Sequence, residues 1–237
     1  MRVGIAGYGY VGKAVERAIA PPHRAYVYDP PLGYGMPHGL QDCELIFVCV
    51  PTPTRPDGTV DTSMVESVVG VVRGGDRLLV VRSTMPAEYA APPRVVYQPE
   101  FIGESRWAPW REETDVGLVV AGGDCGQEVL DFWKPLLGPE VQYIGTDWHT
   151  AADIKYAINC HGAVKVAWWT EFLGTCHKPD AVRNAIMSVP WITAYHTLPL
   201  GGVGGKCFPK DLAAWAACHQ TPIATAALAY LKGARNE

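Results

Sequence analysis

Cys207 is the side chain with the clearest chemical setting, because it lies between a glycine-rich turn and the expected start of a helix. The stretch GGVGGKCFPKDL occupies residues 201–212. Glycines let the backbone approach a ligand closely, and Pro209 suits the first turn of a helix. A thiol at such a helix start, close in sequence to Lys206 and Lys210, is expected to ionise near neutral pH and to act as a nucleophile. A buried structural cysteine is the alternative interpretation.

A long helix without proline is expected from Thr150 to about Cys176. Lys155 and Asn159 are four residues apart on it, so an ammonium and an amide share one helical face and can point at a single ligand oxygen. A solvated surface pair is the alternative. The helix is apolar and aromatic over much of its surface, and this predicts a homodimer packed across residues 150–176.

The N-terminal motif GYGYVG, residues 7–12, follows a short apolar strand and precedes a helix-like stretch. In this context Gly7 permits a tight turn, Gly9 lets a pyrophosphate approach the backbone, and Gly12 lets the helix pack on the strand. A second strand ends at Asp29, about 20 residues further on, where a carboxylate can bind a ribose 2′-OH. This spacing favours NAD over NADP. The alternative for Asp29 is a turn residue before two prolines.

The strands that follow end in polar residues. The apolar run LIFVCV is followed by Pro51 and Thr52, and the strand RLLVVRS runs into Ser83 and Thr84. The carboxyl ends of parallel strands form the binding crevice of an open α/β sheet, so these groups should converge there. Two carboxylates after the next strand should join them, namely Glu100 and Glu104. Each group taken singly also fits a local cap, a turn or a solvated loop charge.

These patterns predict an α/β protein with a Rossmann-type doubly wound sheet, followed by a small all-helical domain with a long central helix. We expect an NAD-binding domain at residues 1–146 and a helical dimerisation and catalytic domain, with the Cys207 loop, at residues 147–237. The net charge of −4 argues against a nucleic-acid partner recognised by a basic surface. No apolar run suggests a membrane helix. The seven cysteines form no CxxC pair, which favours reduced thiols and no metal site. We also expect a cytoplasmic location, since the N-terminus does not resemble a signal peptide.

Six motifs resemble the UDP-glucose/GDP-mannose dehydrogenase family and occur in its order, over essentially the whole chain: GYGYVG, VPTPT, STMP, PEFIGE, KYAIN and GGKCFPKD. In that family NAD oxidises the primary alcohol of a nucleotide sugar twice, through an aldehyde and an enzyme thioester, to a uronic acid. The resemblance therefore implies an NAD-dependent, four-electron dehydrogenase of the UDP-glucose 6-dehydrogenase type.

The resemblance also implies a role for each matched residue. Cys207 would hold the acyl group, and Asp211 and Lys155 would assist proton transfer and stabilise the oxyanion, a role that Asn159 would share. Glu104 would act in thioester hydrolysis. Thr84 would help hold the water and the cofactor, and Lys210 would contact the cofactor. The full set expected to bind the cofactor is Gly7, Gly9, Tyr10, Val11, Gly12, Asp29, Pro51, Thr52, Ser83, Thr84, Glu104 and Lys210.

Some features depart from the family pattern. Family members usually continue into a third domain that grips the nucleotide, and we expect that domain to be absent here. The stretch before Cys207 lacks the usual arginine, and Lys206 replaces a typical serine. A smaller substrate, or a partner that supplies the missing domain, therefore stays open. The alternatives are a two-electron hydroxy-acid dehydrogenase, which would leave Cys207 without a task, and a non-catalytic NAD-binding scaffold, which would not need the reactive groups.

Overall fold

A computed structural model of the chain describes residues 1–237 apart from 104–107, 109, 191, 193–206, 220 and 234–237. The chain divides into two units. Unit 1 consists of Met1–Pro53 and Val60–Lys155, and unit 2 of Thr54–Thr59 and Tyr156–Glu237. The sequence analysis placed a domain boundary after residue 146, whereas these units divide within the long helix α5 (Trp148–Thr175). The first turns of that helix are packed with the sheet, which explains the difference.

Unit 1 is built on one seven-stranded sheet with the order β2-β1-β3-β4-β5-β6-β7. The strands are β1 (Val3–Ala6), β2 (Ala25–Tyr28), β3 (Leu45–Val48), β4 (Leu78–Val81), β5 (Val95–Tyr97), β6 (Leu118–Gly122) and β7 (Gln142–Thr146). All neighbours are parallel except β5 and β6. β3 and β4 are buried along their whole length, as expected for parallel strands covered on both faces. The predicted doubly wound α/β class is confirmed.

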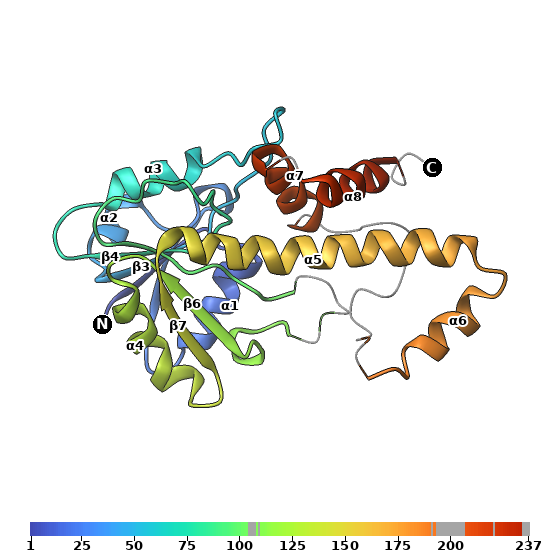
Figure 1. Cartoon of the computed structure of the whole chain (residues 1–237). Helices are drawn as coiled ribbons and strands as arrows, with labels where there is room; N and C mark the ends of the chain where they lie inside the picture. Colours follow the sequence, from blue (N-terminus) through green and yellow to red (C-terminus); the bar gives the residue numbers. More distant parts are fainter. Residues whose placement is uncertain (104–107, 109, 191, 193–206, 220, 234–237) are drawn as a thin grey trace. The chain divides into compact units, whose positions relative to one another are not determined.

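Helices cover both faces of this sheet. Figure 1 shows α1 and α4 on one side and α2 and α3 on the other, in agreement with the contacts of α1 with α4 and of α2 with α3. Their bounds are α1 (Tyr10–Ile19), α2 (Pro37–Gln41), α3 (Ser63–Val72) and α4 (Gly126–Leu137). The connection after β1 leads to β2 on one side of β1, and the connection after β2 leads to β3 on the other side. A topological switch point therefore lies at the carboxyl ends of β1 and β3.

The core between the sheet and the α1–α4 layer is apolar and aromatic. Phe47 of β3 lies 5.8 Å from the Phe132 ring and 5.5 Å from the Trp133 ring of α4. Trp133 is fully buried, and its indole N–H donates a hydrogen bond of 2.9 Å to Gln98 Oε1. This bond gives the N–H of the buried indole an acceptor and holds Gln98, which directly follows β5.

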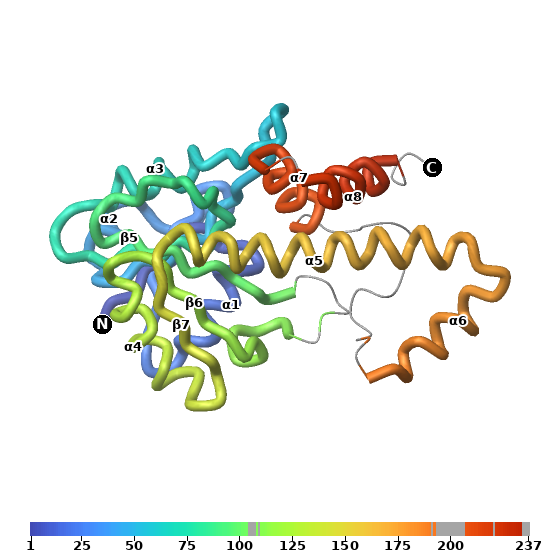
Figure 2. The backbone as a smooth tube through the Cα atoms, viewed as in Figure 1, coloured from blue at the N-terminus to red at the C-terminus, as the bar shows by residue number. Residues whose placement is uncertain are grey.

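The regular secondary structure of unit 2, in its described residues, is helical. α5 is one continuous helix of 28 residues (Figure 2), and it is followed by α6 (Pro179–Ile186), α7 (Cys207–His219) and α8 (Pro222–Gly233). Ala163 and Ala167 of α5, Leu212 of α7, and Ala227 and Leu231 of α8 form one buried cluster. Within the described part of the chain, no helix has the length and apolarity needed to cross a membrane.

Candidate active site

The glycine-rich turn after β1 has the geometry that the motif requires. Gly7 has a φ of +91°, and a methyl group there would lie 2.7 Å from the Cys49 carbonyl carbon. A methyl group on Gly12 would overlap the Gly7 carbonyl oxygen, whereas one on Gly9 would meet no described atom within 4 Å. Gly7 and Gly12 are therefore needed for packing, and Gly9 leaves a surface open to a ligand. This pattern fits a dinucleotide pyrophosphate at the start of α1.

Asp29 is bound to this turn. Its Oδ2 accepts a hydrogen bond of 2.7 Å from the Tyr8 amide, and its Oδ1 accepts one of 3.3 Å from the Leu32 amide. The second bond caps a short 3-10 helix, η1 (Pro30–Leu32). The carboxylate thus acts as a turn residue, as the alternative interpretation has it, and it also lies beside the glycine-rich turn. Its predicted bond to a ribose hydroxyl stays a prediction.

A hydrogen bond joins the chain after β4 to the chain after β3. Ser83 Oγ donates a hydrogen bond of 2.6 Å to the Val50 carbonyl oxygen and so joins the carboxyl ends of the two strands. Thr52, Ser83 and Thr84 are buried, whereas Pro51 is exposed. Ser83 thus contacts the chain that follows β3, and the convergence of Thr52 and Thr84 on the same site stays a prediction.

Lys155 is a buried cation of unit 1, with a residue exposure of 2%. Its Nζ donates hydrogen bonds of 2.6 Å to the Glu100 backbone oxygen and 2.9 Å to Glu100 Oε1, and it lies 5.7 Å from the centre of the Phe101 ring. The sequence analysis placed Glu100 at the crevice but assigned it no role. Its position directly after β5 was the available signal. Glu104 lies outside the described residues.

A second buried ion pair was missed by the sequence analysis. Arg82, at the end of β4, places Nη2 2.7 Å from Glu113 Oε1, with side-chain exposures of 1% and 6%. Burial raises the pKa of Glu113, and the nearby Arg82 opposes that rise. Arg82 Nε and Nη1 have no hydrogen-bond partner among the described residues. Only the place of Arg82, just before Ser83, could have drawn attention to it.

Unit 2 contains a buried polar cluster around Asp211, a residue with no exposed surface. Asn159 Nδ2 donates a hydrogen bond of 2.6 Å to Asp211 Oδ2. Lys210 Nζ lies 2.7 Å from Asp211 Oδ1, as an ion pair whose angle is not that of a hydrogen bond. Burial, and then the charge of Asp211, raise the pKa of the Cys160 thiol to about 12. Cys160 is therefore held as a neutral thiol.

Cys207 is half-buried at the first residue of α7. It is four residues before Asp211 on the same helix, so the thiol and the carboxylate share one helical face. The glycine-rich turn that precedes it, together with Lys206, lies outside the described residues. The predicted nucleophile and the predicted proton-transfer group are thus carried by one element.

The two groups expected to act on one ligand oxygen have separate partners. Lys155 binds Glu100 in unit 1, and Asn159 binds Asp211 in unit 2. They remain on successive turns of α5, and their common action on a ligand stays a prediction. No described group of three or more His, Cys, Asp and Glu side chains is placed to hold a metal ion.

A glycine-rich turn at the switch point of a doubly wound sheet defines the dinucleotide-binding α/β class. Two family models then match the chain: the NAD binding domain of the UDP-glucose/GDP-mannose dehydrogenase family at residues 34–98, and the central domain of that family at residues 149–236. Together they cover more than half of the sequence. The chain belongs to the UDP-glucose/GDP-mannose dehydrogenase family.

The chain spans less than half the length of the curated relatives it matches. It is 28% identical over 194 residues to UDP-glucose 6-dehydrogenase of Rickettsia felis, covering 74% of this chain and 43% of the relative. Among solved structures it is similar to a UDP-glucose dehydrogenase from Pyrobaculum islandicum, with a TM-score of 0.78, 23% identity and coverage of 98% of this chain and 68% of that one. A UDP-D-ManNAc dehydrogenase from Pyrococcus horikoshii gives a TM-score of 0.81 at 18% identity, over 100% and 69%. These two likenesses show the fold.

Proposed function

We propose that this chain binds NAD and oxidises the primary alcohol of a nucleotide sugar twice, to the uronate, as a UDP-glucose 6-dehydrogenase does. The observation that carries the proposal is the face of α7 shared by Cys207 and Asp211, where Asp211 is fully buried and bound to Asn159. Burying a carboxylate is costly, so its place one helical turn after a half-buried thiol favours a chemical role. The family membership supports the same assignment.

The chemistry needs two hydride transfers, and bound NAD would accept a hydride in each. The first transfer, in which the hydroxyl proton would pass to a base such as Asp211, leaves an aldehyde. The Cys207 thiolate then forms a C–S bond to the aldehyde carbon, and loss of the second hydride from this thiohemiacetal gives a thioester. Attack of water on the acyl carbon breaks the C–S bond, releases the carboxylate and restores the thiol. Each hydride takes two electrons, so four electrons leave the carbon.

The chain's own polar groups would support these steps. Lys155 is an N–H donor for the oxygen that gains negative charge, and the Asn159 amide is a second donor. Asp211 would take part in proton transfer, and Glu104 and Thr84 in positioning and activating the hydrolytic water. The cofactor would lie on the glycine-rich turn with its ribose at Asp29, and Lys210 would contact it.

We also propose a homodimer packed across α5, and a cytoplasmic setting in which the thiols stay reduced. Trp168 and Phe172 stack with ring centres 5.6 Å apart, and they are 56% and 39% exposed. Large exposed aromatic side chains next to each other are typical of an interaction surface.

The test is NADH formation across a panel of nucleotide sugars. The wild type should release two NADH per sugar consumed, and Cys207→Ser should abolish thioester turnover while retaining weak alcohol oxidation. Glu104→Gln should leave a covalent adduct on Cys207, visible by intact mass. Cys176→Ser, which changes another half-buried thiol of unit 2, should behave as wild type. A yield of one NADH per sugar, unchanged in Cys207→Ser, would establish the two-electron dehydrogenase instead.

Cofactor choice has its own test. A carboxylate at Asp29 would repel a 2′-phosphate, so NAD should bind more tightly than NADP, by about tenfold or more. Calorimetric titration with the two cofactors measures this ratio. Equal affinities would overturn the assignment of Asp29 to the ribose.

A further inference from the structure

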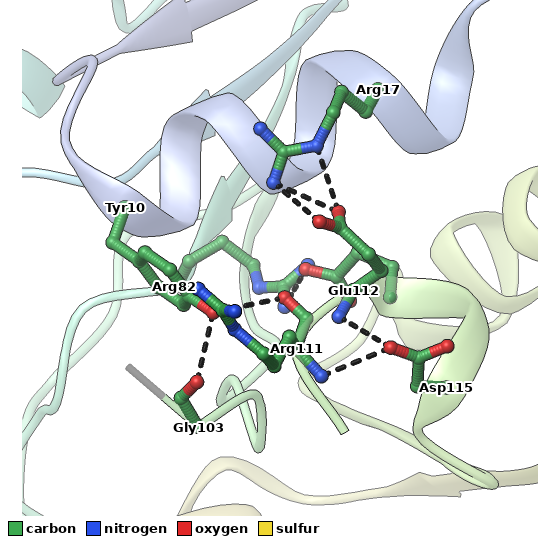
Figure 3. Close-up of polar contacts among 8 residues, drawn as sticks. Tyr10, Arg17, Arg82, Gly103, Arg111, Glu112 and Asp115 are labelled. Carbon is green, nitrogen blue, oxygen red and sulfur yellow. Dashed lines mark hydrogen bonds and ion pairs between the residues drawn. The ribbon is translucent and has the colours of Figure 1, made fainter. Parts of the chain in front are cut away.

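The hydroxyl of Tyr10 connects the cofactor turn to the chain that follows β5. Tyr10 Oη lies 2.8 Å from the Gly103 carbonyl oxygen and 3.1 Å from the Arg111 carbonyl oxygen (Figure 3). The Gly103 amide in turn donates a hydrogen bond of 2.8 Å to the Trp110 carbonyl oxygen. We call residues 98–103 the first stem and residues 110–115 the second stem. One side chain of α1 thus bonds to both stems.

The second stem has further anchors of its own. Arg17 of α1 forms a two-pronged ion pair with Glu112, through bonds of 2.8 and 2.9 Å (Figure 3). Glu113 is held by the buried Arg82, and Asp115 Oδ2 accepts the amides of Arg111 and Glu112. Because these contacts hold the second stem independently of Tyr10, loss of the Tyr10 hydroxyl should act mainly on the first stem.

The first stem is the part that holds Lys155. Glu100 gives Lys155 both a backbone oxygen and a carboxylate oxygen, and Phe101 places its ring beneath the ammonium. Glu100 is only three residues before Gly103, so a shift of Gly103 moves the oxygens that hold Lys155. The reacting groups of a dehydrogenase must be placed to within a fraction of an ångström, and small displacements there are costly.

The backbone of Tyr10 lies at the first turn of α1, directly after Gly9 of the glycine-rich turn. We propose that Tyr10 is a positioning residue: its hydroxyl couples the conformation of the glycine-rich turn to that of the first stem and thereby sets the position of Lys155. This inference rests on the proposed function for the role of Lys155 and for the cofactor at the turn. A phenol has one proton to donate, so the nearer Gly103 oxygen is its main acceptor.

Hydrogen exchange tests the connection without relying on activity. Tyr10→Phe keeps the ring and removes the hydroxyl. Tyr143→Phe is the matched control, because Tyr143 also donates a bond of 2.8 Å to a glycine carbonyl, that of Gly138, elsewhere in unit 1. With each protein saturated with NAD, as calorimetric titration verifies, the cofactor should slow amide exchange in residues 98–103 of the wild type and of Tyr143→Phe, but not of Tyr10→Phe. Equal NAD-dependent protection in Tyr10→Phe, or none in a wild type that binds NAD, would overturn the inference.

A double-mutant cycle then tests the route through Glu100. Tyr10→Phe and Glu100→Gln should each lower kcat, by about tenfold or more, with little change in the KM for NAD, and the double variant should be no slower than Glu100→Gln. Losses that simply multiply would show that Tyr10 does not act through Glu100. A wild type that forms no NADH from any nucleotide sugar would refute the proposed function, and the exchange experiment would still decide whether Tyr10 links the turn to the stem.

Discussion

Lys155, Asp211 and Arg82 each bring a charged side chain to a position that is 2%, 0% and 2% exposed. Each has an oppositely charged atom close by: 2.9 Å from Lys155, and 2.7 Å from Asp211 and from Arg82. A buried ion pair rarely stabilises a fold relative to an apolar pair, because desolvation offsets the attraction. The first two pairs include predicted catalytic residues. The third pair fixes the second stem, and its effect can be measured as stability.

Arg82→Leu should lower the free energy of unfolding by ~3–5 kcal/mol, because it leaves the Glu113 carboxylate buried without its partner. Glu113 has a raised pKa, so the stability gained from its protonation is present at low pH and is lost as pH rises through that pKa. The deficit of Arg82→Leu should therefore be larger at about pH 8 than at about pH 5. Urea unfolding at the two pH values measures it.

The double variant Arg82→Leu with Glu113→Leu serves as the control for that experiment. It removes both charges, so it should recover a large part of the lost stability and should show no such growth of the deficit with pH. A single variant as stable as wild type at both pH values would mean that the pair is not buried in solution.

Sequence reasoning at this scale predicted candidate reactive residues but not the partners that they bind. Cys207, Asp211, Lys155 and Asn159 belong to short motifs, in which spacing along a helix sets the shared face. The Lys155–Glu100 contact joins residues 55 apart in sequence. No local pattern indicates that Glu100 binds Lys155, because only the fold brings the end of β5 to α5.

The glycine-rich turn between β1 and α1 leads to a prediction about two of its glycines. Gly9→Ala should fold with near wild-type stability, since its methyl group would meet no described atom, but it should raise the Kd for NAD by about tenfold or more. Gly12→Ala should instead lower stability by ~2 kcal/mol, because its methyl group collides with the Gly7 carbonyl.

Thermal unfolding and calorimetric titration of the two variants separate these effects. If Gly9→Ala left the NAD affinity unchanged, the cofactor would not bind at this turn. An equally stable Gly12→Ala would show that the turn can relax around a side chain.

Elements with a strong apolar signature were predicted well, and weakly patterned ones were not. The continuous apolar residues of β3 and β4 and the glycine-rich turn gave clear signals. β7 lies at the edge of the sheet, and its residues Gln142 and Gly145 are exposed, so it lacks the apolar run of a buried strand. The antiparallel direction of β6 rests on one register pair, Tyr97 with Gly122, and periodicity carries no information about direction. The short α6, without buried residues, was also missed.

At the scale of the whole molecule, the exposed aromatic side chains of α5 predict assembly. Trp168→Glu should convert the proposed dimer into a monomer, because a charge in the centre of an apolar contact must be desolvated. Light scattering at micromolar concentration measures the mass. Ile223→Glu is the control, since Ile223 of α8 is 71% exposed in the same unit and should leave the mass unchanged. A monomeric wild type would contradict the proposed dimer.

The six residues Thr54–Thr59 belong to unit 2, although the chain on either side of them belongs to unit 1. Within this segment Gly58 has a φ of +91°, and a methyl group on it would lie 3.1 Å from Ala217 Cβ of α7. The backbone therefore passes between the units after Pro53, after Thr59 and after Lys155. A protease that nicked α5 after Lys155 would produce two fragments, and the first would still carry a short piece that packs on the second. The two fragments should consequently stay associated through a size-exclusion column, so the covalent link along α5 is only one of the connections between the halves of this chain.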